Sequence, residues 1–280
     1  MPGPTIQRCQ LGIELKRLRD AAGVTRPDAA AGIGCSPAKI AHIESGRNAP
    51  SKTELIVLLR DHYGADKETL DTLEELRKEA SQRGWWSTYG LPDWLARCVG
   101  LEFDATSVRS MALEVIPGLL QTEEYARMLH SLRGRLTAKE RDRRVAVRME
   151  RQARLLGPNP VELQAVISEA ALVRCARQAD LGLAQLQRLT ERARQPNVEL
   201  RILPFDIGLH AGMSGLFNLF SFPDQLLPDA AHQEYAVGGH IIDDQDAVAQ
   251  LARLFDELRS QALGVDESLA MVAEFIDQAR

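Results

Sequence analysis

The residues from Gly32 to Ser51, GIGCSPAKIAHIESGRNAPS, are the part of this sequence whose types and spacing could do chemistry. Lys39, His42 and Arg47 can donate hydrogen bonds, and the small residues 36–38 lead into them. A helix with small side chains at its start can lie in a major groove about 12 Å wide, whereas a bulky outer face would block entry. Polar and cationic side chains beside it can contact phosphates and base edges. This stretch therefore indicates noncovalent recognition of duplex DNA.

Two short helices joined by a glycine turn must position these side chains. Thr25, with Asp28 three residues later, has the pattern of a helix N-cap, and the alanine-rich run 26–31 follows as a helix. Gly34 supplies the turn, because a positive φ costs glycine little. A close crossing of the two helices requires a small residue such as Ala30 inside the first of them.

The second of these helices begins at Ser36, a preferred N-cap, with Pro37 at its first position. Ile40 and Ile43 form its buried side, and Gly46 ends it. The exposed start of this helix then projects outward from the pair of helices.

Further helices surround this pair. An earlier helix carries Leu11, Leu15, Leu18 and Ala22 at helical spacing. A fourth helix starts at Ser51, and a charged amphipathic run, DKETLDTLEELRKEAS, has the character of a connector that leaves the bundle. We therefore predict an all-α helix-turn-helix domain with a connector helix over residues 1–82.

Charge is distributed unevenly along the chain. Residues 1–65 contain nine Lys and Arg against six Asp and Glu, a balance of +3. Residues 205–280 contain three Arg against thirteen Asp and Glu, a balance of −10. The front of the chain can therefore approach phosphates, and the acidic tail should avoid them.

The stretch LKRLRDAAGVTRPDAAAGIGCSPAKIAHIESGRNAPS closely resembles the XRE type of helix-turn-helix DNA-binding domain. The resemblance implies phosphate contacts by Arg26, Lys39, Arg47 and Asn48, and base-edge contacts by Ser36, Pro37, Ala38 and His42. It also implies a structural ion pair between Arg19 and Glu44. Arg26 stands where the family usually has glutamine, so it keeps that role with an added charge. Pro37 and Ala38 cannot hydrogen-bond a base with their side chains, so readout would rely on thymine methyl groups, Lys39, His42 and DNA shape.

Each of these assignments has an alternative. Arg26, Lys39 and Arg47 could be ordinary solvated charges, and His42 could simply be exposed. Their common spacing around one helix-turn-helix favours DNA contact. A helix-turn-helix can also serve only as a protein-binding surface.

From residue 83 to residue 280 we predict an α+β domain with a small mixed sheet. The runs VELQAVISEA, VELRILPFD, LFNLFSF and QEYAVGG have strand character, with a helix over LAQLQRLTERARQ between the first two. LEFDATSVRSMALEV is interpreted as a helix, followed by a turn at Pro117 and Gly118 and a helix capped by Thr122. Helices over DQDAVAQLARLFDELRSQAL and VDESLAMVAEFIDQAR close the chain.

Two features of this second domain allow more than one interpretation. The three tryptophans, Trp85, Trp86 and Trp94, could stack on bases or cover an apolar ligand, but core packing is favoured. The helix TAKERDRRVAVRMERQARLLG carries arginines at three- and four-residue steps. They could bind DNA or an acidic partner, but a solvated face pairing with Glu140, Asp142 and Glu150, or with the acidic tail, is favoured.

No catalytic motif is recognisable. The polar candidates Glu169, His210, Ser214, Asp243 and Asp244 form no known constellation, and GMSGL lacks the last glycine of G-x-S-x-G. The four cysteines, Cys9, Cys35, Cys98 and Cys175, lie far apart and are interpreted as reduced, mostly buried thiols. We therefore expect no enzymatic activity, no metal site and no cofactor. Since no signal peptide or membrane-length apolar run is present, we expect a cytoplasmic location and no membrane contact.

The segments IPGLLQTEEYARML, RMERQARLL, VISEAALVR and GLFNLFSFPD resemble the uncharacterised C-terminal domain of a large group of actinobacterial regulators, some of them labelled antitoxin-like. The resemblance implies an effector domain that dimerises, senses a small molecule or binds a small partner protein encoded nearby. The expected function is a homodimeric transcription regulator that binds a double-stranded DNA operator. The alternative is an antitoxin-like module that captures the small partner and uses DNA binding for autoregulation.

Overall fold

The computed structural model describes residues 2–132, 134, 136–223 and 227–279. The chain divides into two compact units, one built mainly on residues up to Thr88 and the other mainly on residues 105–223 and 228 onward. None of the helices in the described ranges combines the length and apolar character that a membrane-spanning segment needs. Helix α6 (Asp93–Asp104) contributes residues to both units.

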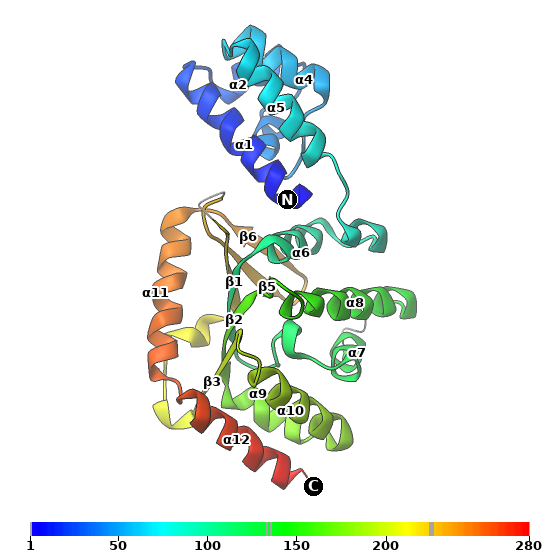
Figure 1. The fold of residues 1–280 in the computed structure, drawn as a ribbon, viewed down its shortest axis with the longest axis vertical. Coiled ribbons are helices and arrows are strands. Elements are labelled where there is room, and N and C mark those ends of the chain that lie inside the picture. The colour runs from blue at the N-terminus through cyan, green and yellow to red at the C-terminus, as the bar shows by residue number, and fades with distance from the viewer. Residues whose placement is uncertain (1, 133, 135, 224–226, 280) are drawn as a thin grey trace. The chain divides into compact units, whose positions relative to one another are not determined.

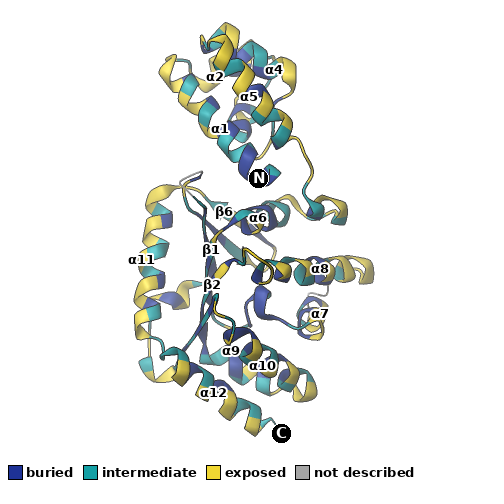
Figure 2. Ribbon diagram, in the orientation of Figure 1, coloured by how far each residue is buried: buried dark blue, intermediate teal, exposed yellow. Residues whose placement is uncertain are grey.

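The first unit is entirely helical. Its elements are α1 (Pro4–Ala21), α2 (Arg26–Gly32), α3 (Pro37–Glu44), α4 (Lys52–Ile56), the π-helix η1 (Val57–His62) and α5 (Lys67–Ala80), followed by the short 3-10 helix η2 (Trp85–Tyr89). Their inner faces enclose one apolar core that includes Leu11, Leu15, Ala30, Ile40 and Leu59. Figure 2 shows this arrangement as buried inner faces and exposed outer faces on the helices.

The predicted helix starts of this unit are confirmed. Thr25, Ser36 and Ser51 are the N-caps of α2, α3 and α4, and each side chain accepts a hydrogen bond from a backbone N–H three residues later. Gly34 and Gly46, which end α2 and α3, have φ values of 65° and 68°. The sequence therefore determines where α3 begins and ends through its own local chemistry.

Helix α5 differs from its expected role as a connector. Its Leu73 and Ala80 are buried in the core of the bundle, and α5 packs along α1. The apolar stripe of this charged helix has a partner, so α5 is a structural member of the helical bundle rather than an exit from it.

The second unit contains a six-stranded mixed sheet in the order β3-β2-β1-β4-β5-β6 (Figure 1). Its strands are β1 (Ser107–Ala112), β2 (Glu162–Ser168), β3 (Val198–Leu203), β4 (Phe217–Ser221), β5 (Ala230–Tyr235) and β6 (Gly238–Ile242). The pairs β1–β2 and β2–β3 are parallel, and the remaining pairs are antiparallel. The predicted fold class, an all-α unit followed by an α+β unit with a mixed sheet, is confirmed.

Helices cover both faces of this sheet. The helices are α7 (Glu123–Leu132), α8 (Ala138–Arg151), α9 (Glu169–Ala176), α10 (Ala179–Ala193), α11 (Gln245–Gln261) and α12 (Val265–Gln278). Short 3-10 turns interrupt the connections: η3 (Gly118–Leu120), η4 (Gln152–Leu155), η5 (Phe205–Ile207) and η6 (Ala211–Ser214). Figure 1 shows α11 on one face and α9 and α10 on the other, and all three helices contact strands of the sheet. The helices expected over DQDAVAQLARLFDELRSQAL and VDESLAMVAEFIDQAR are confirmed as α11 and α12.

The expectation of a helix through LEFDATSVRSMALEV is wrong, because α6 ends at Asp104 and Ser107–Ala112 form strand β1. This strand lies inside the sheet, parallel to β2 on one side and antiparallel to β4 on the other. Val108 and Met111 are both buried. Hydrogen bonding to strands on both sides and burial of both faces stabilise a strand here, and they outweigh the helical pattern of the local sequence.

The tryptophans have packing roles. Trp86 is buried, and its ring meets that of Trp85 edge to face at 5.7 Å between centroids. In the second unit, Trp94 stacks on the ring of His232, which is also buried, at 6.0 Å. Of the cysteines, Cys98 and Cys175 are buried, whereas Cys9 and Cys35 are only half-buried.

Candidate nucleic-acid interface

Helices α2 and α3 form a helix-turn-helix whose crossing depends on small residues. Ala29 and Ala30 of α2 are fully buried, and the carbonyl of Ala30 accepts a hydrogen bond of 2.9 Å from the Cys35 N–H. With Gly34 in the left-handed region, this bond reverses the chain directly before Ser36. The start of α3 is therefore held at the surface.

The predicted base-reading residues share the outer side of α3. Ser36, Pro37 and Ala38 are exposed, and His42, one turn beyond Ala38, is half-buried. Ile40 and Ile43 on the opposite side are buried in the core. The structure thus leaves Ser36, Pro37 and Ala38 exposed at the start of α3, with no large side chain among them to block a groove, and places His42 one turn beyond Ala38.

Glu44, at the end of α3, joins three helices. Its side chain is only 3% exposed and accepts hydrogen bonds from Arg19 Nε of α1 at 2.5 Å and from Arg26 Nε of α2 at 2.8 Å. Arg19 also donates to the carbonyl of Val24 at 2.8 Å. The hydrogen bond with Glu44 raises the pKa of Arg19. The predicted Arg19–Glu44 pair is present, and the structure extends it with Arg26.

Arg26 is placed to use two parts of its guanidinium. Its Nε–H binds Glu44, while its side chain remains 45% exposed. A guanidinium has five N–H donors in a planar fork, so one donor can be fixed while the two terminal nitrogens contact a phosphate. The Glu44 contact therefore orients Arg26 and leaves its terminal nitrogens available for a phosphate. Sequence reasoning missed this contact, because it depends on how α2 crosses α3.

The loop after α3 presents Arg47 and Asn48. The carbonyl of His42 accepts hydrogen bonds from both of their backbone N–H groups, at 2.9 and 3.2 Å. Both side chains are exposed. Gly46 is needed here on two counts, since its φ is 68° and a Cβ would lie 2.7 Å from the Cα of Cys9. The loop thus holds two polar side chains beside the outer face of α3.

Lys39 has a partner that sequence reasoning also missed. Its ammonium forms an ion pair with Oε1 of Glu54, the third residue of α4. The other carboxylate oxygen of Glu54 accepts the Ser51 N–H at 2.8 Å, and the Ser51 hydroxyl accepts the Glu54 N–H at 3.2 Å. The S-x-x-E pattern of this capping box is readable in the sequence, but the link to Lys39 is not. One carboxylate therefore ties α3 to the start of α4.

Protonation equilibria reflect this link. Partial burial opposes ionisation of Glu54, but the hydrogen bonds from Lys39 and Ser51 outweigh burial and lower the pKa of its carboxyl. The hydrogen bond with Glu54 raises the pKa of Lys39. Both groups are therefore charged near neutral pH, and together they add no net charge to the start of α3.

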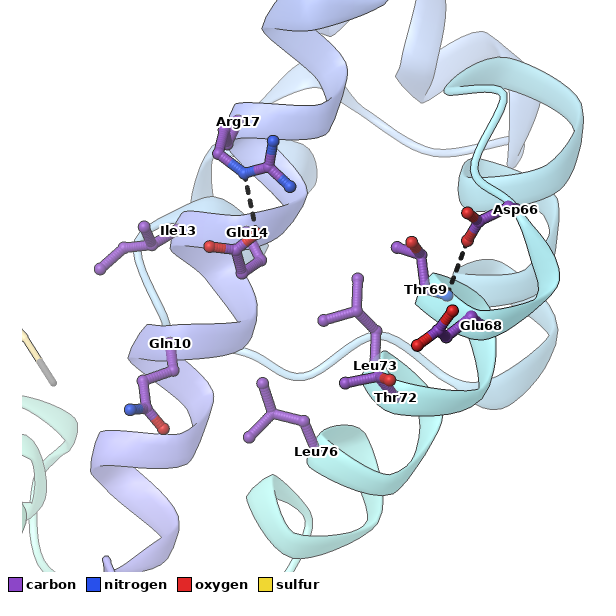
Figure 3. Close-up of a pocket in the computed structure, with 10 residues that line it drawn as sticks. All are labelled: Gln10, Ile13, Glu14, Arg17, Asp66, Glu68, Thr69, Thr72, Leu73 and Leu76. Carbon is purple, nitrogen blue, oxygen red and sulfur yellow. Dashed lines mark hydrogen bonds and ion pairs between the residues drawn. The ribbon is translucent and has the colours of Figure 1, made fainter.

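A hollow of about 530 Å³ lies between α1 and α5 (Figure 3). Leu73 and Leu76 point from α5 toward α1 across it, and Glu14 and Arg17 of α1 form an ion pair at 2.9 Å on its rim. The side of α1 that meets α3 is a different one, because a Cβ at Gly12 would lie 2.5 Å from the carbonyl oxygen of Ile43. The hollow is therefore separate from the candidate interface.

Three of the polar candidates of the second unit, Glu169, Asp243 and Asp244, take structural contacts. Glu169 accepts the Phe205 N–H at 2.8 Å, and Asp244 caps α11 by accepting the Ala247 N–H at 2.9 Å. Asp243 pairs with Arg97 at 3.2 Å. Among the described residues, no group of three or more His, Cys, Asp or Glu side chains could hold a metal ion.

The acidic residues of α8 contact its own N-cap and neighbouring elements. Glu140 caps α8 through Thr137, Asp142 binds Arg127 of α7, and Glu150 accepts from Tyr89 at 2.7 Å. Arg148 donates to the Gln121 side chain at 2.8 Å. The arginine-rich helix is thus fixed to its neighbours within the second unit.

Comparisons with known proteins cover both units. A family model for a helix-turn-helix domain matches residues 10–73. A second family model, described as a domain of unknown function (DUF5753), matches residues 95–274, which is more than half of the chain. No curated protein matches the chain, and no solved structure matches it. The first match includes α2, the glycine turn, α3 and Glu54, so the N-terminal unit is a helix-turn-helix domain of the kind that binds DNA.

Proposed function

The chain belongs to the DUF5753 family, and we propose from this premise, together with the helix-turn-helix match, that it is a sequence-specific DNA-binding transcription regulator. The observation that carries the proposal is the small, exposed start of α3, flanked by the exposed cations Arg26 and Arg47. The resemblance to XRE regulators of the actinobacterial group supports it. The proposal places the chain in the cytoplasm with its operator and gives it no catalytic step and no cofactor.

In this proposal α3 is the recognition helix. Ser36, Pro37, Ala38 and His42 face the base edges, where Ala38 can contact thymine methyl groups and His42 can hydrogen-bond. Arg26, Arg47 and Asn48 contact phosphates and fix the position of the helix in the groove. Because two of the base-facing residues cannot hydrogen-bond with their side chains, DNA shape contributes to the choice of operator.

The regulator acts as a homodimer. One helix-turn-helix buries little surface on DNA, whereas two copies on half-sites one helical turn apart roughly double the contacts. The second unit supplies the dimer contact or the response to an effector.

A second candidate function is supported by a loop of the second unit. Phe205, Leu209 and Met213 lie within nine residues between β3 and β4, and their exposed fractions are 55%, 90% and 56%. Large apolar side chains gathered in one exposed segment are typical of protein-binding surfaces. In this alternative, the second unit captures a small partner protein and DNA binding serves autoregulation.

The first experiment measures binding of the full chain to duplex DNA from upstream of its own gene and to a scrambled duplex, at several salt concentrations. The regulator proposal requires preference for the upstream DNA and a steep loss of affinity with salt. Arg47→Ala should flatten the dependence on salt, whereas Arg174→Ala, at an exposed arginine of the second unit, should not. Absence of salt-dependent binding to either duplex contradicts the proposal.

The same assay separates the second candidate. If the product of a neighbouring small gene must be added before specific binding appears, the partner-dependent module is favoured. The double variant Leu209→Ser/Met213→Ser should then no longer respond to the small protein, so specific DNA binding should not appear when that protein is added. Leu132→Ser is the matched control, since Leu132 is 74% exposed but lies on α7. If the loop variant responds to the small protein as the control does, the loop is not its docking site.

A further inference from the structure

The cations near α3 are held by carboxylates in two different ways. Arg26 binds Glu44 through Nε and keeps its terminal nitrogens available, since its side chain is 45% exposed. Lys39 has a single charged group, and that group is in contact with Glu54. A lysine ammonium is one compact positive charge. When a carboxylate already neutralises that charge, little of it is left to attract a phosphate.

Lys39 is otherwise well placed to reach DNA. It directly follows Ala38 on the exposed start of α3, its side chain is 39% exposed, and its flexible four-carbon stem gives it reach. A released Lys39 would be a general phosphate ligand, and such contacts carry no sequence information.

Glu54 is fixed where it holds this ammonium. Its second oxygen caps α4 by accepting the Ser51 N–H, so the side chain cannot swing away without loss of the capping box. The side chain is only 21% exposed. The carboxylate therefore presents a constant negative charge to Lys39 beside the recognition helix.

We propose that Glu54 is a specificity-determining residue, which holds the Lys39 ammonium and so prevents α3 from gaining a sequence-independent phosphate contact. This inference rests on the proposed DNA-binding function. Specificity is the difference between the affinities for operator and non-operator DNA. An interaction that lowers the affinity for non-operator DNA therefore raises specificity without any new base contact. Lys39 then differs from Arg26 and Arg47, and its expected phosphate role is suppressed in the native chain.

The test is the variant Glu54→Gln in the full chain. Glutamine also serves at this position of a capping box, so α4 keeps its start while the ion pair with Lys39 is lost. We expect several-fold tighter binding to a scrambled duplex at low salt, and a salt slope steeper by about 0.9, the value for one added phosphate contact. The preference for upstream DNA should fall accordingly. A melting temperature of the helical unit only a few degrees below that of the wild type shows that the fold is intact.

Three further variants make the result decisive. Glu68→Gln removes an exposed carboxylate from α5 and controls for net charge, so it should bind as wild type does. Lys39→Ala should leave the salt slope nearly unchanged, and the double variant Glu54→Gln/Lys39→Ala should lose the gain seen in Glu54→Gln. The inference is overturned if Lys39→Ala alone flattens the slope as Arg47→Ala does, or if the double variant keeps the gain. Absence of salt-dependent binding by the wild type overturns the proposed function itself, which is a different outcome.

Discussion

Two carboxylates, Glu44 at the end of α3 and Glu54 on α4, hold the cations of the candidate interface, but they differ in burial and in the number of cations they bind. Glu44 is 3% exposed and binds two guanidiniums, whereas Glu54 is 21% exposed and binds one ammonium. Removing a partner from a buried ion pair costs several kcal/mol, but an exposed pair contributes little to stability. The Glu44 region is therefore required for the fold, whereas the Glu54 region can be altered to change DNA binding with little loss of stability.

The comparison also separates shape from charge at the interface. Arg19 and Glu44 lie below the surface and set the crossing of α1, α2 and α3. Lys39 and Glu54 lie at the surface and set how much positive charge the start of α3 shows to DNA. Substitutions at the two carboxylates should consequently change different measurements.

The largest expected effect is that of Glu44→Gln. Glutamine keeps the shape but leaves the buried guanidinium of Arg19 without its main counter-charge, which we expect to lower the free energy of unfolding by about 3 kcal/mol. Calorimetry of the full chain should show a lower melting temperature for the helical unit. Glu75→Gln, at a residue that is 70% exposed on α5, is the control and should change stability by less than about 0.5 kcal/mol. Equal stabilities of the two variants would remove the distinction between the regions.

A smaller effect on the same region is expected from Gly12→Ala. The added Cβ would lie 2.5 Å from the carbonyl oxygen of Ile43 and 2.6 Å from that of Glu44, so α1 must move away from α3. We expect a loss of about 1–3 kcal/mol. Urea unfolding measures it, with Lys16→Ala on the exposed side of α1 as the control. An unchanged midpoint would mean that the two helices do not need this close approach.

Arg26→Ala tests, by DNA binding, whether a cation held by Glu44 also contacts a phosphate. Glu44 retains Arg19 when Arg26 is removed, so the fold should survive while one phosphate contact is lost. The expected result is a salt slope smaller by about 0.9. Arg60→Ala is the matched control, because Arg60 is exposed and paired with its neighbour Asp61 on η1. Loss of folding in Arg26→Ala would show that Arg26 belongs with Arg19 as a structural cation.

The parts of the fold that sequence could predict are those set by local chemistry. Thr25, Ser36 and Ser51 cap their helices because their hydroxyls satisfy nearby N–H groups, and Gly34 and Gly46 take conformations that other residues avoid. Thr25, Gly34, Ser36 and Gly46 define α2 and α3, which carry the predicted base-reading residues, and Ser51 defines the start of α4.

What sequence could not predict depends on contacts between distant segments. Strand β1 exists because β2 and β4 flank it, and α5 joins the bundle because α1 receives its apolar stripe. The bonds from Arg26 to Glu44 and from Lys39 to Glu54 span 18 and 15 residues. A basic residue near a recognition helix has the same appearance in the sequence whether it is available to DNA or already neutralised.

The smallest expected effect is the pH dependence of the Lys39–Glu54 link. The pKa of Glu54 is lowered in the folded chain, so its stabilising contribution is complete above its ordinary value of 4.5 and is lost as pH falls through the lowered value. The pKa of Lys39 is raised, so its contribution is complete below 10.5 and is lost as pH rises through the raised value.

Between these limits, Glu54→Gln should lower the free energy of unfolding by about 0.2–1 kcal/mol, as expected for a partly exposed pair. As pH falls below 4.5 and through the lowered pKa of Glu54, the difference between wild type and variant should shrink, because protonation removes the charge that the glutamine also lacks. Urea unfolding of both proteins at pH 3.5 and pH 7 measures this difference. A difference that grows toward pH 3.5 would show that the capping role of Glu54, and not its charge on Lys39, dominates its contribution to stability.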